Sequence, residues 1–581
     1  MLRLPDSAPR SVFNGNLIDM RNRKQALDQI ANHEFDLCII GGGATGAGCA
    51  LDAQLRGLKT VVIDAGDFAS GSSTAATKMV HGGVRYLQEA VNDLDVGQYH
   101  LVEDALRERA VMLQNAPHLT RTVEFLVPCF SHFEKLYYGL GMKMYDWISG
   151  KSSLLPSRML TRQEALYRMP AMQPNNLIGA VAYADGQFDD ARYAMALIET
   201  FAAAGGEALN YASAVGFTKD ESGKLASVTV SDQASSGTFQ IPARAFVNAT
   251  GPFSDVVRQL ASPGVAPRMR PSKGVHIMFP LDGFSEKDAL LIPKTEDGRV
   301  IFAIPWNGRL LVGTTDTGYT PGEEMVVTRD EIEYLLRQLN PYLNLPLAAE
   351  QVLSGFAGVR PLVAAQGVTD TKKLIRDEEV EFNSATGLIS ILGGKWTTHR
   401  LMAEETLDKV QEYLGVPLSP TRTLDHPLAG SSGFHWDYWQ TLANDFKIPT
   451  PTAQHLAHKY GTLAPDVLEL AASDRSLALP LIEGEAPVRA QVVYAVRKEM
   501  ALTVEDVLAR RIGLQLFGWR LAIQAAPTVA TLLRQELGWS AREEQSAVER
   551  YVTKVNHMIT TAGQAPEPTP SAIKDLVLER S

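Results

Sequence analysis

The sequence predicts a mixed α/β fold followed by an α-helical C-terminal part. Up to about residue 400, short runs of β-branched residues alternate with Gly-rich turns and helical patterns, which is typical of α/β proteins. From about residue 425 the apolar residues recur every four positions, which indicates helices. The clearest series is Val488, Val492, Val496 and Met500. Thr503 can cap a further helix together with Asp506, in a weaker form of the capping box.

Length and composition exclude several classes of protein. A chain of 581 residues is long enough for roughly two to four domains. Apolar residues make up 45% and charged residues 21%, so the chain is not collagen-like, coiled-coil or wholly disordered. The formal charge of −11 argues against a nucleic-acid-binding protein, and an anionic ligand would need a local cluster of cations.

The cysteines and the apolar segments indicate a cytoplasmic location. Cys38, Cys49 and Cys129 show no CxxC spacing, which argues against a disulfide framework and a metal site and fits a reducing compartment. The N-terminal residues lack the apolar run of a signal peptide, and no stretch of about 18 apolar residues could span a bilayer.

The first element is a dinucleotide-binding unit that begins at residue 35. A buried-strand pattern, FDLCII (35–40), runs into a Gly-rich turn, then into a helical pattern and a second strand that ends at Asp64. In the turn, Gly41 permits the tight bend, Gly43 lets a diphosphate approach, and Gly46 allows close packing of the helix on the strand. Asp64 can accept both ribose hydroxyls, which disfavours a 2′-phosphate and leaves NAD and FAD open.

Three later elements favour FAD over NAD. Residues 211–250 are predicted to form a three-stranded meander that ends in VNATGP and brings Gly251 to the first strand. Residues 299–316 are predicted to form a hairpin, because Asn307-Gly308 is a strong type I′ turn signal. Residues 388–405 follow as a strand, a turn at Gly393-Gly394 and the start of a helix, whose N-terminal amides can stabilise negative charge on a reduced flavin.

These motifs, taken together, identify a family. The series resembles the FAD-dependent sn-glycerol-3-phosphate dehydrogenases, of the glycine-oxidase/D-amino-acid-oxidase group, over about residues 35–410 and again in KEMALTVEDVLARR (498–511). The motifs are FDLCIIGGGATGAG, STAATKMVHGGVRYL (73–87), VNATGPFSD, PSKGVHI (271–277), FAIPWNGRLLVGTTDT, GFAGVRPL (355–362) and GGKWTTHR (393–400).

The resemblance implies an α/β fold with an FAD-binding Rossmann-type domain, a mixed-sheet substrate domain and an α-helical C-terminal cap. We expect residues 1–100, 180–265 and 350–415 in the FAD-binding domain and 101–179 and 266–349 in the substrate domain. Residues 420–560 are expected to form the helical domain, and the Pro-rich 561–581 a flexible tail.

The resemblance also implies a reaction and partners. The expected reaction is oxidation of sn-glycerol 3-phosphate at C2 to dihydroxyacetone phosphate, with hydride transfer to N5 of a non-covalently bound FAD. Electrons would pass to a membrane quinone. The alternatives are an oxidase that uses O2, an amino-acid or amine oxidase of the same group, and a non-catalytic flavin protein. A homodimer is left open.

The expected catalytic residues are two histidines and an arginine. Oxidation of a secondary alcohol requires a base and a nearby positive charge. His81 is the first candidate for the base and His276 the second, while Arg360 is expected to face the reacting oxygen. The substrate phosphate is expected to bind basic and hydroxyl side chains, namely Arg85, Tyr86, Lys273, Lys395 and Thr77.

The motifs supply the remaining cofactor contacts and two departures from the family. The resemblance assigns the cofactor site to Gly41, Gly43, Gly46, Asp64, Ser73, Thr74, Gly251, Asp316, Gly393, Gly394 and Thr397. Trp396 stands where the family usually has a smaller apolar residue and His399 where it usually has Tyr, so the pocket wall is expected to differ. Asp64 replaces the more frequent Glu.

Residues 125–151 suggest a membrane contact. The segment mixes aromatic and aliphatic residues with Lys135, Lys143 and Lys151, a composition that suits the bilayer interface. The resemblance implies a peripheral membrane protein, which we expect on the inner face of the cytoplasmic membrane. A helix pair packed on the protein core is an equally good interpretation of this segment.

Overall fold

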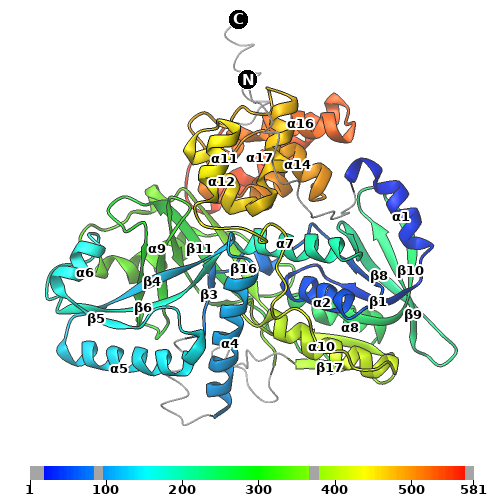
Figure 1. Ribbon diagram of the computed structural model, residues 1–581, viewed down its shortest axis with the longest axis horizontal. Coiled ribbons are helices and arrows are strands. Elements are labelled where there is room, and N and C mark those ends of the chain that lie inside the picture. Colours follow the sequence, from blue (N-terminus) through cyan, green and yellow to red (C-terminus); the bar gives the residue numbers. More distant parts are fainter. Residues whose placement is uncertain (1–18, 84–95, 365–378, 569–581) are drawn as a thin grey trace, which may run out of the picture.

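The computed structural model describes residues 19–83, 96–364 and 379–568, which form two β-sheets and a group of C-terminal helices (Figure 1). Within these residues the first sheet has eight strands: β1 (Phe35–Ile40), β2 (Thr60–Ile63), β7 (Glu207–Leu209), β8 (Ala212–Lys219), β9 (Leu225–Asp232), β10 (Gly237–Asn248), β17 (Glu379–Phe382) and β18 (Leu388–Leu392). The strand order is β17-β18-β10-β1-β2-β7, and β9 pairs with both β8 and β10. β1 lies in the centre, parallel to β10 and β2. Such central parallel strands are covered on both faces, which explains the continuous apolar run FDLCII.

The second sheet forms the opposite half of the molecule (Figure 1). Its ten strands in the described residues are β3 (Met79–Val80), β4 (Thr120–Cys129), β5 (Arg158–Thr161), β6 (Gly179–Phe188), β11 (Ser272–Pro280), β12 (Asp288–Ile292), β13 (Ile301–Trp306), β14 (Arg309–Gly313), β15 (Thr317–Gly318) and β16 (Ser354–Arg360). The order is β15-β11-β14-β13-β12-β4-β6-β3, with β16 beside β11 and β5 beside β6.

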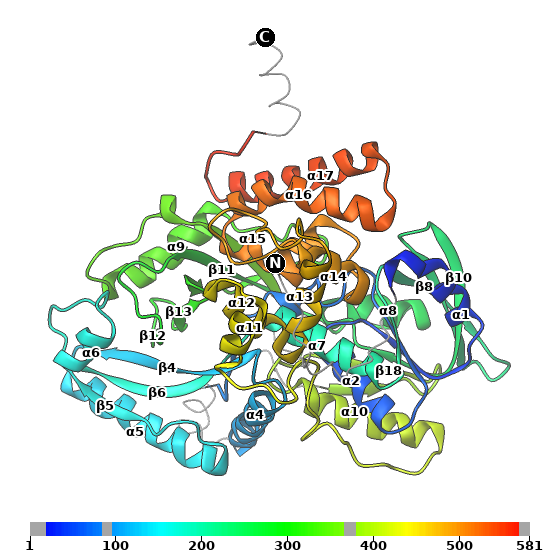
Figure 2. The same cartoon turned by 45° about the horizontal axis from the view of Figure 1, so that its top comes forward.

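Helices pack around the two sheets and above them. Those before residue 415 are α1 (Arg23–Ala31), α2 (Ala44–Leu55), α4 (Val96–Asn115), α5 (His132–Ser149), α6 (Arg162–Arg168), α7 (Asp190–Ala203), α8 (Ser254–Ala261), α9 (Arg329–Leu339) and α10 (His399–Leu414), with the short 3₁₀ helix η2 (Ser72–Thr74). The C-terminal group comprises α11 (Tyr438–Phe446), α12 (Thr450–Tyr460), α13 (Ala464–Ser473), α14 (Ala490–Lys498), the π-helical turn η8 (Asp506–Arg511), α15 (Leu514–Phe517), α16 (Trp519–Leu537) and α17 (Ala541–Thr561). Figures 1 and 2 show this group, coloured yellow to red, as a separate layer over both sheets.

The structure confirms the meander, the hairpin and the helix cap that the sequence predicts. The helix expected from the series Val488 to Met500 is shorter, because α14 spans only Ala490–Lys498. The meander over 211–250 is β8, β9 and β10, and the hairpin over 299–316 is β13 and β14. Asn307 and Gly308 both have positive φ, 48° and 74°, as the type I′ turn requires. Thr503 Oγ1 accepts the Asp506 amide (3.1 Å), while the Asp506 carboxylate accepts the Thr503 amide (2.9 Å), so the predicted cap forms.

The strand pairing suggests domain borders that differ from those expected. β3, β16 and all of β6 after Gly179 lie in residue ranges expected for the FAD-binding part, yet these strands pair within the second sheet. We therefore propose a division that follows the sheets, with the C-terminal layer beginning after α10. Most of the expected tail, from residue 569 on, lies outside the described residues. In the part of the chain that the structure describes, no helix is long and apolar enough to cross a membrane.

Candidate active site

A cavity of about 810 Å³ lies between the two sheets and collects most of the predicted site residues. Its walls come from segments that are distant in sequence: 40–45, 64–83, 212–214, 249–257, 358–362 and 391–397 each contribute residues, with Gly274 and His276. All three predicted glycine turns therefore meet at one place, because β1, β10 and β18 end at the same edge of the first sheet.

The first turn has the geometry of a diphosphate-binding loop. Gly41 has φ 106°, and a Cβ there would lie 2.6 Å from the carbonyl oxygen of Ala249. At Gly46 a Cβ would lie 1.8 Å from the Gly41 carbonyl oxygen, so only glycine permits the close packing of α2 on β1. Gly43 precedes the first residue of α2 and lines the cavity, which places the positive end of the helix dipole there.

Asp64 lies at the end of β2 on the cavity wall. Its two carboxylate oxygens accept the amides of Gly42 (2.7 Å) and Gly66 (2.9 Å). Burial raises the pKa of Asp64 to about 6, although both amide hydrogen bonds oppose this shift. The carboxylate therefore gains from further donors, and the two hydroxyls of a ribose would supply them.

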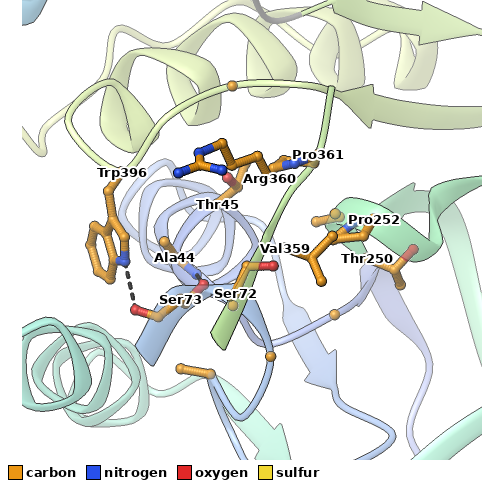
Figure 3. A pocket seen from close by; sticks show the side chains of 18 of the residues that line it. Ala44, Thr45, Ser72, Ser73, Thr250, Pro252, Val359, Arg360, Pro361 and Trp396 are labelled. Atoms are coloured by element: carbon orange, nitrogen blue, oxygen red, sulfur yellow. Dashed lines mark hydrogen bonds between the residues drawn. The ribbon is translucent and has the colours of Figure 1, made fainter. Parts of the chain in front are cut away.

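Ser73 connects two of the glycine turns. Its hydroxyl oxygen accepts the Ala44 amide at the start of α2 (2.9 Å), and its carbonyl oxygen accepts the indole N–H of Trp396 (2.7 Å) (Figure 3). Trp396 packs edge-on against Phe188 and His399, with ring centroids 5.1 Å away in both cases. The two residues that depart from the family pattern, Trp396 and His399, thus form one aromatic wall beside the cavity.

His276 lines the cavity from β11. Its Nε2 is 3.0 Å from Thr77 Oγ1, and its ring stacks on Phe356 with centroids 5.0 Å apart. Nδ1 is buried, and no hydrogen-bond partner for it occurs within the described residues. Burial, followed by the charges of Arg360 and Lys78, holds the pKa of His276 well below its usual range, so the imidazole is neutral at pH 7.

Arg360, the last residue of β16, lines the same cavity. Nη2 donates to Thr314 Oγ1 (3.0 Å) and to the Thr315 carbonyl (2.9 Å), while Nη1 lies 3.4 Å from Asp316. A Cβ on Gly274 would lie 2.4 Å from Nη2, so the absence of a side chain there gives the guanidinium its place. Arg360 is thereby held rigidly at the cavity, which suits a group that stabilises developing negative charge.

The structure places most, but not all, of the predicted residues on this cavity. Those that line it are Gly41, Gly43, Asp64, Ser73, Thr77, His81, Gly251, His276, Arg360, Gly393, Gly394, Lys395 and Thr397. Gly46 and Thr74 lie behind the lining, and Asp316 contacts Arg360 instead. Arg85 and Tyr86 lie outside the described residues.

Lys273 is a correction to the predicted substrate site. Successive side chains on a strand point to opposite faces, so Lys273 turns away from the cavity that its neighbours Gly274 and His276 line. Its ammonium group forms an ion pair with Glu331 at 2.9 Å. The motif PSKGVHI thus lies on a strand that lines the cavity, but residue parity turns Lys273 to the other face of that strand.

Sequence reasoning missed one buried cation beside the cavity. Lys78 is 1% exposed, pairs with the carboxylate of Asp190 and donates to the Thr74 carbonyl (2.9 Å). Its ammonium lies 4.9 Å from the centroid of Phe356, the ring on which His276 stacks. The sequence contains a weak signal for it, because Lys78 stands inside the motif that also carries Thr77 and His81.

The fold and this cavity define the class of protein. A family model described as FAD dependent oxidoreductase matches residues 36–400, and one described as the C-terminal domain of alpha-glycerophosphate oxidase matches residues 421–544. The diphosphate loop, the ribose carboxylate and the turn after β18 all fit FAD. The chain is therefore an FAD-dependent oxidoreductase.

Its relatives narrow the family. The mitochondrial glycerol-3-phosphate dehydrogenase of Rattus norvegicus is 38% identical over 527 residues, which cover 89% of this chain and 72% of the rat protein. The probable mitochondrial glycerol-3-phosphate dehydrogenase of Caenorhabditis elegans is 39% identical over 544 residues, covering 92% and 75%. The structure of the Bacillus halodurans glycerol-3-phosphate dehydrogenase complexed with FAD superposes with a TM-score of 0.76 at 30% identity, covering 93% of this chain and 98% of the other.

The chain belongs to the FAD-dependent glycerol-3-phosphate dehydrogenase family, and it is an enzyme that uses FAD to oxidise glycerol 3-phosphate. This confirms the family, the fold class and the cofactor that the sequence predicts. The roles of individual residues remain predictions.

Proposed function

We propose that the enzyme oxidises sn-glycerol 3-phosphate at C2 to dihydroxyacetone phosphate and passes the electrons to a quinone. FAD, when bound, supplies the hydride acceptor at flavin N5. The observation that carries the proposal is the position of Arg360, His276, His81 and Lys395 on the same cavity as the dinucleotide loops. Arg360 and Lys395 together carry more positive charge than a single carboxylate requires, which favours a phosphorylated substrate over an amino acid.

Each cavity residue has a distinct proposed task. Lys395 attracts the phosphate dianion, and Arg360, held by Thr314 and Thr315, stabilises charge on the reacting oxygen. His276 is a weak base because burial and two cations depress its pKa, so it is better suited to orienting the hydroxyl group. His81, which also lines the cavity, is therefore our candidate for the base.

Anaerobic reduction tests the reaction and its acceptor. We expect sn-glycerol 3-phosphate to bleach the flavin absorbance of the purified enzyme without air, and a soluble quinone to restore it much faster than air-saturated buffer. Rapid reoxidation by air with one peroxide per flavin would instead establish an oxidase. Bleaching by glycine or sarcosine, but not by glycerol phosphate, would establish an amine oxidase.

The two histidines can be separated by substitution. We expect His81→Ala to keep FAD but to lower kcat by about 100-fold or more, which is the usual effect of removing a general base. The exposed His100 on α4 provides the control, and His100→Ala should retain kcat. Stopped-flow measurement of flavin reduction is the readout; near-normal reduction by His81→Ala would transfer the role to His276.

We also propose that α5 contacts the membrane interface. This helix buries Met142 and Tyr145 on its inner face, while its outer face exposes large apolar side chains: Phe133 (76%), Leu136 (55%), Tyr137 (44%), Leu140 (58%), Met144 (40%) and Trp147 (75%). Residues 125–129 belong to strand β4 and 132–149 to α5, so the segment is not a helix pair. The exposed apolar face of α5 supports the interpretation as a membrane contact. Such a helix suits peripheral binding near a quinone.

Vesicle flotation tests this contact. Replacing Phe133 and Trp147 together by serine should lower the vesicle-bound fraction by at least about tenfold, because each buried aromatic side chain contributes about 1.5–3 kcal/mol. Leu418→Ser, which changes an exposed leucine (68%) outside α5, is the matched control. Equal binding of the three proteins would show that α5 is not the contact.

A further inference from the structure

Two arginines of the C-terminal layer reach the segment that forms one wall of the cofactor cavity. This segment, residues 64–73, follows β2 and is called the ribose segment here; most of its residues line the cavity. Asp67 lies inside it and is 1% exposed. Arg511 binds both carboxylate oxygens of Asp67, with Nη1 at 2.7 Å and Nη2 at 2.8 Å, and Arg510 Nε adds a third bond at 2.6 Å.

The arginines are themselves fixed from the C-terminal side. Both belong to the π-helical turn η8, a rare form that is frequent at functional sites. Arg511 donates to the carbonyl of Glu499 through Nη2 (2.7 Å) and Nε (3.1 Å), and Arg510 pairs with Asp506 (2.5 Å). Burial alone would raise the pKa of Asp67, but the two guanidinium groups outweigh it and hold that pKa well below its usual range.

A second wall of the cavity is held from the same place. Tyr211 donates from its hydroxyl to Asp506 (2.6 Å) and from its amide to the Gly66 carbonyl (2.7 Å). Asn210 donates to Asp67 (3.2 Å) and to the Met500 carbonyl (2.8 Å). Residues 212–214, which follow directly, line the cavity. Both neighbouring walls are thus connected to η8, although within the described chain no residue beyond Thr397 lines the cavity.

We propose that Arg510 and Arg511 are positioning residues for FAD: through Asp67 they hold the ribose segment in the conformation that binds the nucleotide. A buried ion pair seldom stabilises a fold more than apolar residues of similar size would, so stability alone does not explain these arginines. It does impose one geometry, and here that geometry places Asp64, three residues before Asp67. The C-terminal layer is accordingly part of the cofactor site without touching the cofactor cavity.

The rate of FAD release from the diluted holoenzyme tests this role, since freed flavin becomes fluorescent. Arg511→Lys keeps the charge but loses the planar fork, and we expect FAD release to accelerate about tenfold, the effect of losing one charge-assisted hydrogen bond. The matched control is Arg497→Lys. Arg497 of α14 also makes a two-pronged ion pair inside the C-terminal layer, with Glu536 through Nε (2.6 Å) and Nη2 (2.7 Å). Among the described residues, no hydrogen bond or ion pair joins Arg497 to the ribose segment or to Arg511.

The expected pattern is faster release from Arg511→Lys and from Asp67→Asn, with unchanged release from Arg497→Lys, even where all three lower the melting temperature. Equally faster FAD release from all three variants, or unchanged release from the first two, would show that the network has only a structural role.

Amide hydrogen exchange of the wild-type protein gives an answer that needs no variant. If the ribose segment and η8 are coupled, removal of FAD must increase exchange in both. Increased exchange at residues 64–73 with unchanged exchange at 506–511 would overturn the proposal.

Discussion

Replacement of Arg360 by alanine is expected to lower kcat/KM for sn-glycerol 3-phosphate by about 1000-fold. Removal of one preorganised donor to a developing oxyanion typically lowers kcat by about 100-fold or more, and the lost charge also weakens binding of an anionic substrate by about tenfold. Arg360 has the rigidity that such a role needs, because Thr314, Thr315 and Asp316 hold its guanidinium on the cavity wall. Steady-state kinetics should show the loss divided between kcat and KM.

Two further variants separate the effect of the lost charge from that of the lost guanidinium geometry and provide a control. Arg360→Lys keeps the charge and loses the fork, so it should recover KM better than kcat. Arg270→Ala removes an exposed arginine just before β11 and should behave like the wild type. FAD content must stay normal in all three. A 1000-fold loss that arises from KM alone, with normal kcat, would assign Arg360 to substrate binding and not to the chemical step.

The sequence could predict the elements whose signals are local. The unit from β1 to Asp64 contains a buried strand, a glycine turn, a helix and an acid at set spacings, and each depends only on its neighbours in the chain. The hairpin at Asn307-Gly308 follows from the positive φ angles that a type I′ turn needs. The sheet to which β6 and β16 belong depends on partners far away in sequence, so the expected domain borders differ from the observed pairing.

In the site, too, the sequence could not predict contacts between side chains that are distant along the chain. Motifs place Lys273 and His276 on one strand, but only the register shows that one faces Glu331 and the other the cavity. Lys78 and Asp190 meet across 112 residues, and Asp67 and Arg511 across 444. Such pairs form only through tertiary packing. A single sequence does not show whether a charged residue will be buried in an ion pair or exposed to solvent.

Replacement of Asp64 by asparagine should release most of the FAD while leaving the apoprotein folded. The carboxylate accepts amides of Gly42 and Gly66 and can still accept the ribose hydroxyls, whereas an amide group replaces one acceptor oxygen by a donor. Loss of two charge-assisted hydrogen bonds corresponds to about 100-fold weaker binding. Equilibrium titration of the apoprotein with FAD measures this, and Asp36→Asn, a partly exposed carboxylate at the start of β1, serves as the control.

The raised pKa of Asp64 predicts a pH dependence with a definite sign. Burial raises the pKa of this group in the folded apoprotein to about 6, against 3.8 for an ordinary aspartate, so the folded state binds the proton more tightly than the unfolded state does. The contribution of Asp64 to the free energy of unfolding is therefore greatest below about pH 4 and falls as pH rises through 6.

Since the ribose hydroxyls favour the ionised carboxylate, FAD affinity should change in the opposite direction and weaken below pH 6, by at most about tenfold per pH unit. In Asp64→Asn both trends should vanish, and its apoprotein should melt at pH 7 no lower than the wild-type apoprotein. A wild-type FAD affinity that stays constant from pH 7 to pH 5 would show that Asp64 does not bind the ribose as a carboxylate.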